Sequence, residues 1–96
     1  MMHIVFLPAA EQEMIEAALY YQSQATKLGD IFICEVEKAI KSIIESPNMW
    51  PILEGKLRRR LLKRFPFGVL YKIETEAIII IAIAHLKRKP GYWKDR

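Results

Sequence analysis

The run Ala77–Ala84 (AIIIIAIA) limits how this 96-residue chain can fold more than any other feature, because it contains no polar residue. It is far shorter than the about 20 residues that a membrane span needs, and isoleucine-rich runs of this length are typical of strands. A strand that is apolar on both faces is an inner strand of a sheet covered on two sides. We expect a helical layer to form one cover, and the ends of the chain or a partner to form the other.

The first half of the chain predicts one strand followed by two helices. His3–Leu7 is a short apolar strand, and apolar residues then recur every three or four positions over residues 9–27, as on an amphipathic helix. Gly29-Asp30 is predicted to break this helix, with the aspartate as the N-cap of a second helix that ends at Ser46-Pro47. Two helices joined by so short a break are expected to fold back as a hairpin.

The second half of the chain changes to the two-residue period of strands. Leu57–Lys63 and Phe67–Glu74 have this period, and Met49–Gly55 is predicted to be the loop that leads from the helices to the sheet. The order becomes β-α-α-β-β-β, in which the last three strands form an antiparallel meander and the first joins one edge. The sequence therefore predicts a single α+β domain over residues 1–96, with a helical hairpin packed on a small, mainly antiparallel sheet.

Positive charge is concentrated in the second half of the chain. Residues 1–55 hold three lysines and eight acidic residues (−5), while residues 56–96 hold twelve Lys and Arg and three acidic residues (+9), which together give +4. The candidate binding residues of the first basic cluster are Arg58, Arg59, Arg60, Lys63 and Arg64. Arginine pairs bidentately with phosphate and with carboxylate, so the cluster suits RNA or an acidic protein segment. Protection of an edge strand is the structural alternative.

A second candidate site follows the inner strand and consists of His85, Lys87, Arg88, Tyr92 and Trp93. RNA cleavage needs proton transfer at the 2′-hydroxyl and the leaving oxygen, and a cation at the phosphate. Arg88 would stabilise the phosphate, and Tyr92 or His85 would exchange protons. Trp93 or Tyr92 would stack on a base. In the structural alternative, Tyr92 and Trp93 pack back over the sheet, and His85 bonds to the backbone.

Other kinds of site have little support in the sequence. His3 and His85 lie at opposite ends of the chain and Cys34 is the only cysteine, so no metal site and no cofactor are expected. The glutamates of the helices are predicted to form a solvated face. The single cysteine, the absence of a basic stretch before the first apolar residues and the lack of a long apolar run together predict a cytoplasmic protein that is not in a membrane.

Two segments of the second half resemble a known family. They are Arg59–Glu74 (RRLLKRFPFGVLYKIE) and Ile78–Trp93 (IIIIAIAHLKRKPGYW). With the opening strand and the acidic helical hairpin, they resemble the RelE/ParE superfamily of toxins from bacterial type II toxin–antitoxin pairs, and their motifs are closest to the ParE-like plasmid stabilisation toxins. The resemblance implies a cytoplasmic toxin that a cognate acidic antitoxin holds inactive in a hetero-oligomer.

The resemblance implies two different targets. ParE-like toxins inhibit DNA gyrase by binding it, and we favour this function, in which the chain itself performs no chemistry. RelE-like toxins cut messenger RNA on the ribosome without a metal; by position Arg88 and Tyr92 match residues that contribute to this cleavage, and Lys63 and His85 complete the candidate set. A third interpretation is a non-toxic domain that binds only its partner. Because the superfamily shares one fold, the fold alone cannot separate these functions.

Overall fold

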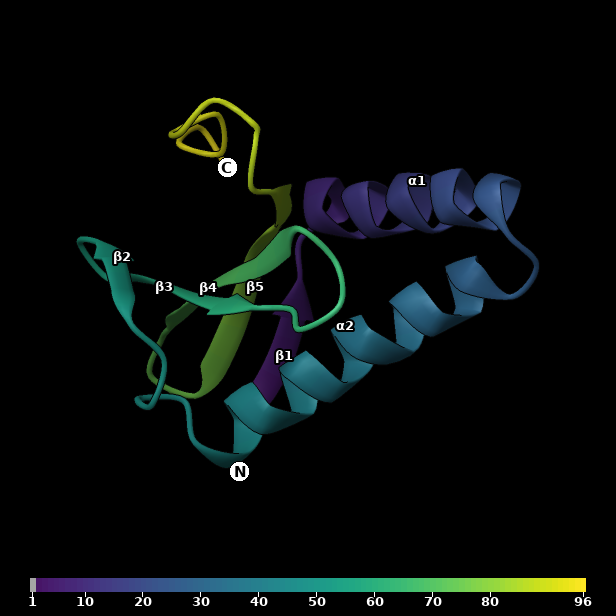
Figure 1. Ribbon diagram of the computed structural model, residues 1–96. Coiled ribbons are helices and arrows are strands. Elements are labelled where there is room, and N and C mark those ends of the chain that lie inside the picture. Colours follow the sequence, from purple (N-terminus) through teal and green to yellow (C-terminus); the bar gives the residue numbers. More distant parts are fainter. Residues whose placement is uncertain (1) are drawn as a thin grey trace.

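The computed structural model describes residues 2–96, which form two helices and a five-stranded sheet (Figure 1). The elements in chain order are β1 (His3–Phe6), α1 (Pro8–Gln24), α2 (Leu28–Glu45), β2 (Ile52–Glu54), β3 (Leu57–Leu61), β4 (Phe67–Ile73) and β5 (Ala77–His85). The strand order in the sheet is β1-β5-β4-β3-β2, with β1 parallel to β5 and the other neighbours antiparallel. The predicted α+β class, with a helical hairpin on a mainly antiparallel sheet, is confirmed.

The short strand β2 was not predicted. The expected loop Met49–Gly55 contains it, so the order of elements is β-α-α-β-β-β-β. Ile52–Glu54 is too short to show a two-residue period, and it becomes a strand only because β3 pairs with it, Ile52 lying opposite Arg58. The predicted strands Leu57–Lys63 and Phe67–Glu74 are also slightly shorter, ending at Leu61 and Ile73.

The break between the helices lies earlier than predicted. α1 ends at Gln24 and α2 begins at Leu28, and Lys27 adopts a left-handed conformation (φ 68°) between them. Asp30 therefore lies in the first turn of α2 and is not its N-cap, although its charge still suits the positive end of the helix dipole. The predicted end of α2 before Ser46-Pro47 is confirmed.

Gly29 is required by the packing of the two helices. A Cβ atom at this position would lie 2.6 Å from the carbonyl oxygen of Ala18 on α1, so the two backbones could not stay so close with any other residue. The N–H of Gly29 donates a hydrogen bond to Oε1 of Gln22 on α1, at 3.0 Å. Gly29, which the sequence suggested as a helix breaker, therefore lies within α2 and allows the backbones of the two helices to pack closely.

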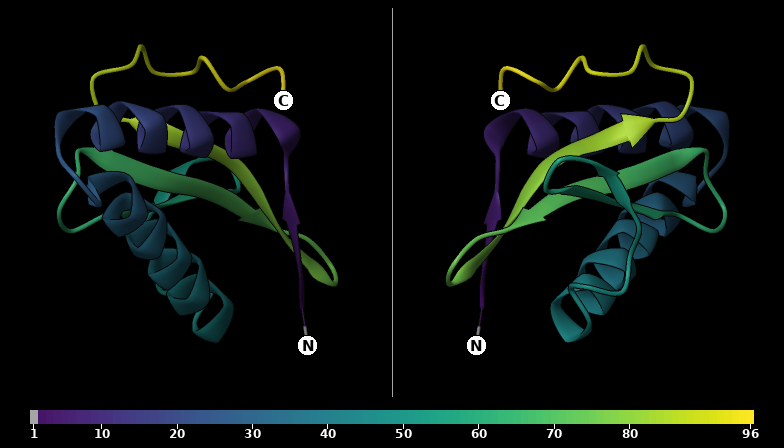
Figure 2. Two further views of the ribbon diagram at one scale, coloured as in Figure 1. Left: turned by 90° about the vertical axis from the view of Figure 1, so that its right-hand side faces the viewer. Right: turned by 90° about the vertical axis from the view of Figure 1, so that its left-hand side faces the viewer.

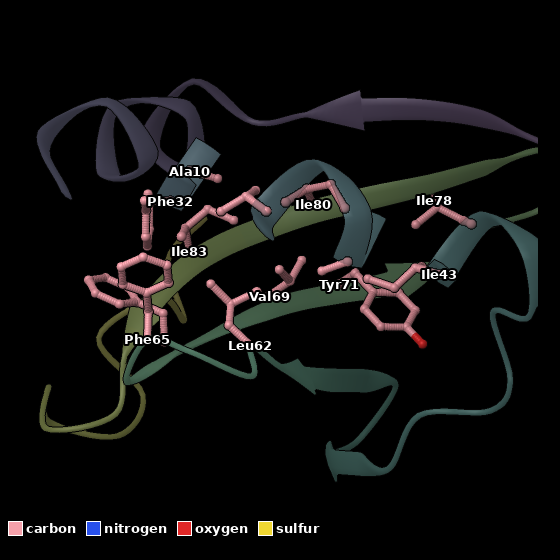
Figure 3. Close-up of a cluster of buried hydrophobic side chains, with 13 residues drawn as sticks. Ala10, Phe32, Ile43, Leu62, Phe65, Val69, Tyr71, Ile78, Ile80 and Ile83 are labelled. Atoms are coloured by element: carbon pink, nitrogen blue, oxygen red, sulfur yellow. The ribbon is translucent and has the colours of Figure 1, made fainter. Parts of the chain in front are cut away.

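The main core lies between the helical hairpin and one face of the sheet. Its fully buried side chains come from both layers and include Ala10, Phe32, Val36, Ala39, Ile43, Val69, Tyr71, Ile78, Ile80 and Ile83 (Figure 3). Rings pack edge to face at one end of this core, where the centroid of Phe32 lies 5.1 Å from those of Phe65 and Phe67. The helical cover that the run Ala77–Ala84 required is therefore present.

The C-terminal segment, residues 86–96, covers the other face of the sheet. A second core forms there from Leu70, Ala82 and Ala84, against which Tyr92 and Trp93 pack. Figures 1 and 2 show the segment returning alongside the sheet and α1 after β5 ends. The second cover of the inner strand is therefore the end of the chain itself, one of the two alternatives that the sequence left open.

Candidate functional site

Two arginines of β3 point to the helical side of the sheet and hold the loop that precedes β2. Nη1 of Arg58 donates hydrogen bonds to the carbonyl oxygens of Asn48 (3.1 Å) and Trp50 (2.7 Å). Nε of Arg60 donates to Oγ of Ser42 on α2 at 3.0 Å, and its guanidinium carbon lies 4.8 Å from the ring centroid of Trp50. Both guanidinium groups therefore have structural partners inside the molecule.

Arg59, between them, points to the opposite face of the sheet. It lies opposite Leu70 of the second core, and its side-chain stem crosses Gly68, where a Cβ would lie 3.0 Å from Cγ of Arg59. No hydrogen bond or ion pair within residues 2–96 involves its guanidinium group. The strand alternation predicted from the sequence thus separates two structural arginines from one that is free to bind.

Four exposed cations lie around one end of the sheet. They are Lys63 and Arg64, in the turn after β3, and Lys87 and Lys89, in the C-terminal segment. The N–H of Leu86 donates to the carbonyl oxygen of Pro66 at 2.9 Å, so the two chain segments that carry these cations are adjacent. We call these four residues the basic end.

A single carboxylate holds the C-terminal segment in place. Glu13 of α1, whose side chain is 12% exposed, accepts hydrogen bonds from the hydroxyl of Tyr92 (2.6 Å), from Nη1 of Arg96 (2.7 Å) and from the N–H of Ile83 (3.1 Å). The prediction that the helix glutamates form a solvated face is therefore wrong at Glu13. Pairing of β1 with β5 stops at Ile80, and the carboxylate satisfies a strand N–H beyond that point.

Arg88 and Tyr92 belong to the same network. The guanidinium carbon of Arg88 lies 3.9 Å from the ring centroid of Tyr92, and its Nη1 lies 3.9 Å from Oε2 of Glu13. Because the side chain of Arg88 is 55% exposed, this ion pair is weak. Burial raises the pKa of the Tyr92 phenol well above its ordinary value, and the hydrogen bond to Glu13 and the charge of that carboxylate raise it further.

His85 and Trp93 also have structural contacts. Nδ1 of His85 accepts a hydrogen bond from the N–H of Lys87 at 3.0 Å, and its ring packs edge to face on Phe67, with 4.9 Å between centroids. Trp93 packs edge to face on Tyr92, at 5.2 Å between centroids, and against the second core. The structural alternative for this part of the chain, with the aromatic residues returned to the sheet and the histidine bonded to backbone, describes what is observed.

The raised pKa of Tyr92 predicts a late alkaline titration. Tyr92 should still be protonated at about pH 10, where a free phenol is half ionised, and burial also raises the pKa of Tyr21 and of Tyr71. The folded-state pKa of Tyr92 is raised, so its contribution to stability is fully present below about pH 10 and is lost as the pH rises further. Because Tyr92 does not ionise near pH 10, the increase in tyrosinate absorbance as the pH passes through about 10 should be the same in the wild type and in the Tyr92→Phe variant. A smaller gain in the variant would show that Tyr92 titrates as a free phenol.

Two neighbouring hollows lie beside Arg59. The larger has a volume of about 280 Å³ and is lined by Leu53, Glu54, Arg59, Leu70, Ala84, His85, Leu86, Arg88, Pro90, Gly91, Trp93 and Lys94. The smaller, of about 240 Å³, is lined by Trp50, Pro51, Ile52, Leu53, Arg59 and Leu61. Leu53 and Arg59 line both hollows. His85 and Arg88 reach the larger one while Lys63 and Tyr92 line neither, so the structure does not gather the four candidate catalytic residues around one cavity.

Sequence reasoning missed Glu13 and Arg96. Glu13 lies three residues after Ala10 and four before Ala17, both of which pack in the main core, so an acid occupies the inward stripe of α1. The sequence does contain this signal. An acidic residue within the apolar stripe of a helix faces the core, and it can be buried there only when hydrogen-bond donors or cations pair with it. Arg96 carries no comparable signal, since its role depends on where the last turn of the chain comes to lie.

Neither helix within residues 2–96 is long and apolar enough to cross a membrane. In the same part of the chain, no three His, Cys, Asp or Glu side chains come together where they could hold a metal ion.

The fold and the site define a small α+β domain that is cationic and partly apolar on the side of the sheet away from the helices. The sequence matches the family described as ParE toxin of type II toxin-antitoxin system, parDE, over residues 4–90. This match spans most of the chain, and the chain belongs to the ParE toxin family. It is thus the toxin half of a type II pair whose other half is an antitoxin.

Relatives and solved structures agree with this assignment. Toxin ParE2 of Mycobacterium tuberculosis, in strains CDC 1551 / Oshkosh and ATCC 25618 / H37Rv, is 29% identical over 82 residues, which cover 84% of this chain and 78% of the relative. A chain of the chromosomal ParDE TA system from P. aeruginosa superposes with a TM-score of 0.78 at 17% identity, covering 88% of this chain and 96% of that one. At that identity the structural likeness shows a common fold.

Proposed function

We propose that this toxin inhibits DNA gyrase by binding to it, without chemistry of its own, and that a cognate acidic antitoxin neutralises it. Membership of the ParE family supports this target, since gyrase inhibition is the activity that the resemblance to ParE-like toxins implies. The observation that carries the proposal is the network around Glu13, because it occupies residues that a ribonuclease would need free. Such an inhibitor would act in the cytoplasm, where gyrase works.

The network works against proton transfer to RNA. Tyr92 donates its hydroxyl proton to Glu13, and its raised pKa makes it a poor base near neutral pH. Arg88 lies on the ring of Tyr92 and beside the Glu13 carboxylate, which would compete with a phosphate. Nδ1 of His85 already accepts a backbone N–H. A binding function needs none of these groups to exchange protons.

The basic end is the surface that we assign to the target. Lys63, Arg64, Lys87 and Lys89 are exposed, and none of them forms an ion pair within residues 2–96. Four such cations on adjacent segments create a positive field that attracts an acidic surface and speeds encounter with it.

The test combines a purified assay with a cellular one. The chain should reduce supercoiling of relaxed plasmid by purified gyrase, and its induction in bacteria should damage DNA while messenger RNA stays intact. Lys63→Glu with Arg64→Glu should weaken inhibition about tenfold or more, whereas Lys41→Glu, an exposed charge reversal on α2, serves as the control. Cleaved messages with normal DNA would replace the proposal with a ribonuclease. An absence of any growth defect would leave a partner-binding domain.

A further inference from the structure

We propose that the basic end binds the phosphate backbone of double-stranded DNA without regard to base sequence. Through this surface the toxin contacts the DNA that gyrase holds, in addition to the enzyme itself. The contact with gyrase-held DNA rests on the proposed function. DNA binding as such requires only the cations of the basic end, so it can be tested separately.

The basic end is built from one five-residue pattern that occurs twice in the chain. The pattern is Leu-Lys-Arg-X-Pro, at residues 62–66 (LKRFP) and again at residues 86–90 (LKRKP). The first copy directly follows β3, and the second directly follows β5. Because both strands pair antiparallel with β4, they run in the same direction, and the two copies leave the sheet at the same end (Figure 2).

Backbone contacts and buried side chains hold the first copy against the second. The N–H of Leu86 donates a hydrogen bond to the carbonyl oxygen of Pro66 at 2.9 Å, which joins the start of one copy to the end of the other. The side chains of Leu62 and Phe65 are buried in the main core. The apolar members of the first copy therefore fix its backbone, while its lysine and arginine remain exposed.

The second copy is fixed at both of its ends. Before it, the N–H of Arg88 donates to the carbonyl oxygen of His85 at 3.0 Å. After it, Tyr92 and Arg96 anchor the chain on Glu13. A backbone that is ordered before binding loses little conformational entropy when a partner arrives.

Positive charge dominates this end of the sheet. Residues 57–73 and 77–94, which contain the two copies, include no acidic residue. The four cations of the basic end form no ion pair within residues 2–96. The neighbouring surface of α2 is electrically balanced, because the residues that share a hollow with Arg64 include two cations and two acids, Lys27, Lys38, Asp30 and Glu35. The net field therefore attracts a polyanion.

The side chains around these cations favour a duplex over a protein or a single strand. Protein interfaces depend on aromatic or apolar anchors, and among the leucines and the phenylalanine of the two copies only Leu86 is exposed. Single strands are held by exposed rings on which bases stack, but Phe65 is buried and the ring of His85 packs on Phe67. Exposed cations without such rings suit phosphates, which position a protein on DNA without specifying sequence.

The experiment measures binding of the full toxin to a labelled DNA duplex of about 20 bp and arbitrary sequence, by fluorescence anisotropy at several salt concentrations. Four phosphate contacts predict a slope of about −3.6 for log K against log salt concentration, so affinity should fall about 100-fold between 50 and 200 mM. At physiological salt the Kd should be micromolar or weaker, as is typical of binding that does not read sequence.

Paired neutral substitutions locate the contacts. Lys63→Gln with Arg64→Gln should reduce the slope to about −1.8, and Lys87→Gln with Lys89→Gln should do the same, because each pair removes two phosphate contacts. Lys41→Gln with Lys56→Gln is the matched control. It removes the same charge from exposed positions on α2 and at the opposite end of β3, and it should leave the slope unchanged. Circular dichroism of each variant establishes that it is folded.

Equal slopes for the Lys63→Gln, Arg64→Gln variant and the control would overturn the proposal. Tighter binding of a single-stranded RNA of the same length would also overturn it. Supercoiling assays on the same proteins keep this proposal separate from the proposed function. A toxin that inhibits gyrase but does not bind the duplex would refute DNA binding alone. A toxin that binds the duplex and leaves supercoiling unchanged would refute gyrase inhibition alone.

Discussion

Replacing Glu13 with alanine should lower the free energy of unfolding by about 3 kcal/mol and the Tm by roughly 15 °C. Its side chain is 12% exposed and accepts hydrogen bonds from Tyr92, Arg96 and the N–H of Ile83. The substitution leaves all three donors without their acceptor, and a buried donor that loses its partner costs more than the bond itself contributes. The expected loss is a large share of the about 5 to 15 kcal/mol that stabilises an ordinary domain.

Thermal and urea unfolding would measure this loss, and limited trypsin digestion would locate it. Release of the C-terminal segment should speed cleavage after Lys87 and Arg88, which lie between β5 and the anchored end. Glu13→Gln keeps one acceptor oxygen and should lose about half as much stability. Glu11→Ala, an exposed change on the same helix, should stay within about 0.5 kcal/mol of wild type. If both alanine variants unfold alike, Glu13 does not anchor the segment.

Phe32→Ala should be the most destabilising single substitution in the main core, at about 4 kcal/mol. The ring of Phe32 is fully buried, and its centroid lies 5.1 Å from those of Phe65 and Phe67 and 5.4 Å from that of Tyr21. Removing it opens a cavity among rigid rings that can relax only in part, and it also removes aromatic contacts that add to the hydrophobic effect.

Ile31→Ala is the matched control, because Ile31 is the preceding residue of α2 and is 37% exposed. Chemical denaturation should place this variant within about 1 kcal/mol of the wild type. A similar loss in both variants would mean that the aromatic cluster contributes no more to stability than an ordinary, partly exposed apolar contact of α2. Near-ultraviolet circular dichroism of Phe32→Ala should also show weaker aromatic signals if the cluster loosens.

The C-terminal segment connects the anchor at Glu13 to the larger of the two hollows beside Arg59. Its residues Pro90, Gly91, Trp93 and Lys94 form one wall of the larger hollow. The carboxylate on α1 thus shapes a surface on the opposite side of the sheet, although it does not line that surface.

Most of the fold followed from the sequence because each long element carries its own periodic pattern. The run Ala77–Ala84 required an inner strand with two covers, and the helical hairpin on one side of it was predicted correctly. The alternation of β3 was also correct, since Arg58 and Arg60 point to one face and Arg59 to the other. Periodicity is a local property, so it can be read without knowing which elements meet.

The sequence by itself therefore determined the class of fold, the second half's positive charge and the side of β3 on which each arginine lies. Only the tertiary structure decided which cations are free. Arg58, Arg60, Arg88 and Arg96 bond to groups that are distant along the chain or on other elements, whereas the guanidinium of Arg59 has no such partner among the described residues 2–96. The position of β2 and the importance of Gly29 were decided in the same way. A side chain's partners depend on contacts between distant segments, and no local pattern records those contacts.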